Sequence, residues 1–198
     1  MECSIDNFWD YIIPDYIIKI FKNHLPRTKE YAVCLLEDNN VRELFNGINY
    51  NNIAFFTPIL REYDKEWYLS TFNSTMENIK GYVVVNIDKL KETTVDYDEA
   101  VFLAGYSLIN DIKYLVIHEC RHVQQNYILR KFFNEDLNKI DKLMALDSKE
   151  GSYDLLEYDA CVYGMSYVSN LYQIYQKEAD KNFINMIYRY YSDKLDLK

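Results

Sequence analysis

Residues 115–127 read LVIHECRHVQQNY, and they decide the fold because an apolar helical pattern carries polar residues at fixed spacing. Apolar residues recur every three or four positions from about 98 to 133, and this range contains no proline. A long helix is therefore predicted. His118 and His122 would share one face of it, and Glu119, rotated by roughly 100° from His118, would flank that face.

This spacing suits a zinc ion. Two imidazole nitrogens one helical turn apart can reach one ion at about 2.0–2.1 Å. Zinc lowers the pKa of a bound water and polarises a carbonyl, so Glu119 is expected to act as general base and then as general acid toward a leaving amine. The chain has three histidines, and two of them lie in this motif.

A catalytic zinc site needs a third protein ligand, and Glu157 is the candidate. It lies in a helix expected from about 153 to 177, where Ala160 and Gly164 share its face and would let this helix approach the histidine helix closely. A carboxylate buried there without a cation would be costly. Cys161 is an alternative ligand, although a buried thiol packing beside the site is the preferred interpretation.

The elements His118-Glu119-x-x-His122 and Glu157-x-Asp159-Ala160 resemble the gluzincin metallopeptidases, especially compact bacterial and phage members. The resemblance spans about residues 81–165; its first motif is specific and its second is short. It implies that His118, His122 and Glu157 bind Zn²⁺, that Glu119 is catalytic, and that the fold is zincin-like.

The resemblance also implies a strand beside the cleft that pairs with an extended peptide substrate. Residues 82–88 fit this position. Such pairing would supply main-chain hydrogen bonds and leave specificity to side-chain pockets. The alternative for the segment is an ordinary core strand.

Further side chains have two interpretations each. Asp159 either orients a ligating histidine or is a solvated carboxylate on a helix face. Tyr158, Tyr163 or Tyr167 could donate a hydrogen bond to an oxyanion, although twenty tyrosines make any single choice weak. Cys120 is expected in the core.

The remaining pattern indicates helices at both ends of the chain and strands between them, an α+β order. We expect one domain over residues 1–198, with a small mixed sheet packed on the long helix. The other expected helices span 14–25, from Thr28 to Gly47, 136–146 and a tyrosine-rich C-terminal stretch, and the expected strands are 53–56, 67–72 and 82–87.

The amino-acid composition limits the classes of molecule that the chain is expected to bind. The net charge of −9 argues against nucleic-acid binding, which depends on clustered Lys and Arg, so a protein or peptide partner is expected. We expect no membrane span, because no apolar run reaches about 18 residues. Four widely separated cysteines predict reduced thiols and a cytoplasmic location. The oligomeric state stays open.

These observations predict a zinc-dependent peptidase. The alternative from another class is a catalytically inactive zinc-binding regulatory or interaction protein that keeps the same fold. A third interpretation is a metal-free fold in which His118 and His122 merely pack; stoichiometric zinc would exclude it.

Overall fold

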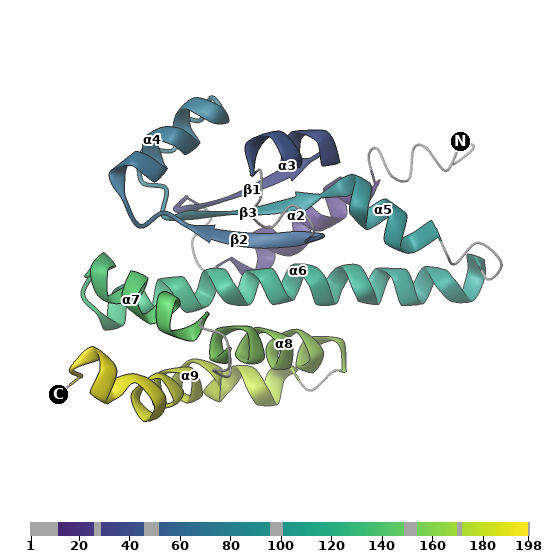
Figure 1. Ribbon diagram of the computed structural model, residues 1–198. Helices are drawn as coiled ribbons and strands as arrows, with labels where there is room; N and C mark the ends of the chain where they lie inside the picture. Colours follow the sequence, from purple (N-terminus) through teal and green to yellow (C-terminus); the bar gives the residue numbers. More distant parts are fainter. Residues whose placement is uncertain are drawn as a thin grey trace.

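The computed structural model describes residues 12–25, 29–45, 52–95, 101–148, 154–169 and 172–197, without the side chains at 94–95, 101–108 and 172–177. This part of the chain is a mostly helical α+β structure with eight helices and a three-stranded mixed sheet (Figure 1). In chain order its elements are α2 (Ile13–His24), β1 (Tyr31–Leu36), α3 (Asp38–Leu44), β2 (Ala54–Pro58), α4 (Glu62–Thr71), β3 (Gly81–Asn86), α5 (Ile87–Val95), α6 (Val101–Phe132), α7 (Leu137–Asp147), α8 (Leu155–Val168) and α9 (Tyr172–Leu195).

The sheet has the order β1-β3-β2, with β1 parallel and β2 antiparallel to β3. Every residue of β3 is buried, as its apolar sequence on both faces predicts. Because side chains alternate along a strand, Val83 and Val85 pack in the core with α2 and α6, while Tyr82 and Val84 pack on the opposite face with α3 and α4.

The long helix α6 lies between two layers (Figure 1). On one side it packs against the sheet through residues such as Ile112, Val116 and Val123, which are at most 1% exposed. On the other side lie α7, α8 and α9, whose apolar residues join the C-terminal turn of α6 in a second core. The predicted long helix is confirmed, and its burial on opposite faces places the histidine motif inside the molecule.

The helix predicted from Thr28 to Gly47 is wrong. Residues 31–36 form strand β1, and only Asp38–Leu44 is helical; Thr28 and Gly47 lie outside the described residues. Tyr31 and Leu35 are spaced for one face of a helix, but the whole run is apolar and equally suits a strand buried on both faces. Pairing with the buried strand β3 decides between them.

The strand predicted at 67–72 is also wrong, because these residues belong to α4 and the turn after it. The Asp64 carboxylate accepts a hydrogen bond from the backbone N–H of Arg61 at 3.1 Å and helps to start the helix. Its aromatic side chains pack on the sheet; the rings of Tyr68 and Tyr82 lie 4.8 Å apart. The aromatic residues of this segment are therefore there to pack a helix on the sheet, and they do not form a strand.

The predictions for β2, β3, α2 and α7 are confirmed to within a few residues. The helix expected from 153 to 177 ends earlier, at Val168 of α8, and residues 172–177 already belong to α9, which contains the predicted tyrosine-rich C-terminal stretch. At the end of α8 the Ser169 hydroxyl donates to the carbonyl of Met165 at 2.8 Å, a local bond that competes with continued helix.

Candidate metal centre

His118 and His122 point their Nε2 atoms at one place beside α6, with 3.1 Å between them. They stand one helical turn apart, so the i, i+4 geometry expected from the sequence is present. His118 is only 6% exposed, and His122 is partly buried. The local fold therefore brings the nitrogens of two mostly buried imidazoles together.

Glu157 reaches the same place from α8. Its Oε1 lies 3.0 Å from His118 Nε2, and its Oε2 lies 3.2 Å from His122 Nε2. Hydrogen bonds from the two histidines hold the pKa of Glu157 well below its usual range. Four donors at about 2.0–2.1 Å from a tetrahedral ion stand about 3.3 Å apart. These three residues therefore fit a metal ion.

Small side chains on α8 allow this approach, as the sequence predicted. Ala160 is fully buried, and a Cβ on Gly164 would lie 3.0 Å from the ring of Tyr114 on α6. That distance is tighter than ordinary van der Waals contact. The small residue at 164 thus lets α8 lie close to Tyr114 on α6.

Cys161 lies beside the same donors. Its Sγ is 3.7 Å from Glu157 Oε1, and the donor atoms of His118, Glu157 and Cys161 all lie within 4.8 Å of one another. Cys161 is partly exposed rather than buried. Cys120, in contrast, is fully buried, as expected for a core residue.

Glu119 is 4% exposed and lines the cavity described below. Its Oε2 has no hydrogen-bond partner among the described residues. Burial raises the pKa of Glu119, while His122 and His118 oppose that rise. A carboxyl group whose pKa is moved toward neutrality is suited to accept and return a proton.

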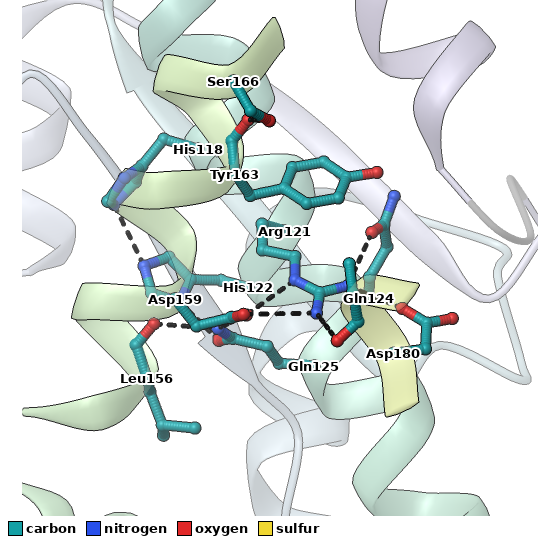
Figure 2. Close-up of polar contacts among 11 residues, drawn as sticks. His118, Arg121, His122, Gln124, Gln125, Leu156, Asp159, Tyr163, Ser166 and Asp180 are labelled. Atoms are coloured by element: carbon teal, nitrogen blue, oxygen red, sulfur yellow. Dashed lines mark hydrogen bonds and ion pairs between the residues drawn. The ribbon is translucent and has the colours of Figure 1, made fainter. Parts of the chain in front are cut away.

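Gln125 fixes the orientation of His122 (Figure 2). Its Nε2 donates to the Leu156 carbonyl and to Asp159 Oδ2, both at 2.8 Å. Its Oε1 consequently faces His122 Nδ1 at 2.9 Å and accepts a hydrogen bond from it, so His122 Nε2 would be left to present its lone pair to a bound ion. The i, i+3 spacing on one helix was the only sequence signal for this contact.

Asp159 fits neither of its two predicted roles. It is 4% exposed, so it is not a solvated carboxylate, and it reaches His122 only through Gln125. Its direct partner is Arg121, whose Nε lies 2.6 Å from Asp159 Oδ2. Arg121 also bonds Asp180 Oδ1 at 2.7 Å (Figure 2).

Arg121 is 0% exposed and occupies a variable position of the motif, so sequence reasoning missed it. Burial opposes its charge, but Asp159 and Asp180 outweigh that effect and raise the pKa of Arg121. Its guanidinium also lies 4.8 Å from the centre of the Tyr163 ring. Arg121 thus joins α6, α8 and α9 directly behind the histidines.

A cavity of about 640 Å³ opens in front of the site. Its walls come from β2 and the residues before it, α6, α7 and the start of α8. The described residues lining it are Asn52, Ile53, Ala54, Phe55, Phe56, Tyr114, Leu115, His118, Glu119, His122, Met144, Asp147, Ser148, Asp154, Leu156 and Glu157.

The tyrosines proposed as oxyanion donors do not line this cavity. Tyr158 is 59% exposed, Tyr163 is buried against Arg121, and Tyr167 contacts the His24 ring. Tyr114, one turn before His118, lines the cavity instead. Its i, i+4 spacing from His118 could have indicated it.

A carboxyl pair, Asp147 and Asp154, also lines the cavity. Asp147 accepts hydrogen bonds from the backbone N–H groups of Leu155 and Leu156, at 2.9 and 3.1 Å, and from the hydroxyl of Tyr191. Burial, together with a hydrogen bond to Asp147, raises the pKa of Asp154 to about 6. This carboxyl pair was not predicted.

The strand expected to pair with substrate is not available for pairing. β3 is the central strand, hydrogen-bonded to β1 on one side and β2 on the other, so the ordinary core interpretation of 82–88 is correct for the strand. β2 is the edge strand on the cavity side, and Ala54, Phe55 and Phe56 line the cavity.

Comparisons with protein-family profiles, with curated proteins and with solved structures find no match. No helix in the described ranges combines the length and apolar character needed to cross a membrane. The geometry of this site is therefore the evidence for the function of the chain.

Proposed function

We propose that this chain is a zinc-dependent peptidase with a zincin-like fold. One observation carries the proposal: three donor residues meet within 3.0–3.2 Å beside a buried carboxyl group on the wall of a cavity. His118, His122 and Glu157 would hold the ion. A zinc ion in such a site lowers the pKa of a water and polarises a carbonyl group.

Glu119 is the proposed general base. Its raised pKa and its unpartnered Oε2 support proton transfer from a water in the cavity and then to the leaving amine. The position of Glu119, one residue after His118, directs its carboxyl group into the cavity rather than among the three donors. Tyr114 is the cavity residue best placed to donate a hydrogen bond to a developing oxyanion.

β2 is the proposed binding edge for an extended peptide. Strand addition needs a free row of backbone groups, and among the described strands the outer edge of β2 is the one next to the cavity. A peptide in this position would run antiparallel or parallel to β2 with its carbonyl groups near the histidines. The reduced cysteines still favour the cytoplasm as the setting of this activity.

Three variants test the proposal. Glu119→Gln should retain about one zinc per chain and lose cleavage of a proteome-derived peptide mixture by at least about 100-fold. Glu157→Ala should lose zinc as well. Glu178→Gln, an exposed change on α9, is the matched control and should retain both.

Cleavage by Glu119→Gln at the parental rate would refute this mechanism. One observation favours the alternative of a non-catalytic zinc protein: the thiol of Cys161 lies close enough to act as a fourth donor, and structural zinc sites have four protein ligands. Tight zinc binding without cleavage of any peptide would support that alternative.

A further inference from the structure

Cys161 follows Glu157 by one turn of α8, so the two side chains share a helix face. The distance between Cys161 Sγ and Glu157 Oε1 is 3.7 Å. In a tetrahedral zinc site with bonds of about 2.3 Å to sulfur and about 2.0 Å to oxygen, those atoms stand about 3.5 Å apart. The thiol is therefore nearly at the separation that a shared ion requires.

The widest separation in this donor group is less favourable. The donor atoms of His118, Glu157 and Cys161 span up to 4.8 Å, whereas the separations among His118, His122 and Glu157 are 3.0–3.2 Å. The sulfur must move toward the imidazoles to bind the same ion. Of the four donors it is thus the one most easily released.

The chemistry of the four donors suits zinc. Two neutral imidazoles, one carboxylate and one thiolate would supply two negative charges, which balance the charge of Zn²⁺. Sulfur and nitrogen donors together are typical of zinc sites.

We propose that Cys161 is a fourth, releasable donor to the cation held by His118, His122 and Glu157. With sulfur bound, the ion has four protein donors and the site is closed. With sulfur released, it has three donors and one open position. Binding requires only that the thiol lose its proton to solvent as the sulfur–metal bond forms.

This inference depends on the proposed zinc site, and cobalt distinguishes their failures. Co²⁺ bound to a thiolate gives an intense near-ultraviolet charge-transfer band. The parent should bind one Co²⁺ and show this band, and Cys161→Ala should retain the Co²⁺ and lose the band. Cys34→Ala removes a buried thiol of β1 and should leave the band unchanged.

One bound Co²⁺ without the band in the parent, or with an intact band in Cys161→Ala, would overturn the role of Cys161 alone. No bound Co²⁺ in any variant would refute the metal site and this inference together. If the protein is active, Cys161→Ala should also cleave peptides faster than the parent, because its site is always open.

Thiol reactivity gives a second, independent measurement. Alkylation of Cys161 by iodoacetamide, followed by peptide mass spectrometry, should be about tenfold slower with saturating zinc, because a bound thiolate is a poor nucleophile. His118→Ala should abolish this protection. Equal rates with and without zinc in the parent would contradict the proposal.

Discussion

The two sides of the histidine pair differ in how their polar groups are satisfied. Behind His122, the buried charges of Arg121 and Asp159 are paired, and Gln125 completes the network. In front, Glu119 lines the cavity, and its Oε2 is buried without a partner among the described residues. A fully satisfied network stabilises the fold, whereas unsatisfied buried groups are costly and mark the side on which chemistry is expected.

The largest expected effect comes from breaking the satisfied side. Arg121→Met should lower the free energy of unfolding by about 3–5 kcal/mol, because it leaves Asp159 charged and buried. Urea denaturation of the metal-free protein measures this loss. The double variant with Asp159→Leu should recover much of it, and Arg189→Met on the exposed face of α9 should change little.

A similar loss in the double variant would show that the pair is not the source of the stability.

Gln125→Leu tests whether the satisfied side also tunes the site. Loss of the acceptor for His122 Nδ1 should weaken zinc binding about 10–100-fold, because the imidazole is no longer held in its ligating tautomer. Competition with a chelator of known affinity measures the change. Gln124→Leu is the matched control, because it alters the neighbouring amide and leaves the contact to His122. Equal zinc affinities for the two variants would contradict this role of Gln125.

The unsatisfied side should respond in the opposite direction. In the metal-free protein at neutral pH, Glu119→Gln should raise the free energy of unfolding by about 1 kcal/mol, because a neutral amide costs less to bury than a carboxylate. The same variant should lose activity. A destabilised Glu119→Gln protein would mean that the carboxyl group belongs to the stabilising network.

The smallest effect concerns Asp154, whose raised pKa also belongs to the cavity side. A carboxyl group with a folded pKa of about 6 binds its proton more tightly in the folded state than in the unfolded state. Its contribution to stability is complete below about pH 4 and is lost as the pH rises through about 6.

Asp154→Asn should therefore flatten the dependence of unfolding free energy on pH between about 4 and 6, by less than about 1 kcal/mol because the residue is exposed. Asparagine retains the N-cap of α8, where Asp154 accepts from the N–H of Glu157. Asp136→Asn, at the N-cap of α7, controls for the capping change. An unchanged slope in Asp154→Asn would contradict the shift.

Sequence reasoning predicted that His118, His122 and Glu157 lie together, as they do, because helical spacing places side chains on shared faces. It did not locate Arg121 or Gln125 in the site, because their partners lie on α8 and α9 and only the tertiary fold brings them together. The spacing of residues along one helix is visible in the sequence, whereas contacts between different helices are not.

The secondary-structure predictions likewise succeeded where the signal lies within one segment and failed where it depends on tertiary pairing. The continuous apolar run of β3 and the long period of α6 are strong signals, and both elements are present. The short run of β1 suits either a helix or a strand, and pairing with β3 determines the outcome. That pairing also made β3 central, which left β2 as the edge beside the cavity.

The three proposed nitrogen and oxygen donors come from only two helices, so the distance between α6 and α8 sets the separation of the donor atoms. The contact between Gly164 and Tyr114 limits how close the two helices can come. One substitution at this contact could therefore change the size of the ion that the site prefers. We expect Gly164→Ala to separate the two helices slightly without altering any ligand, and so to shift the preference of the proposed site from Zn²⁺ toward larger divalent ions.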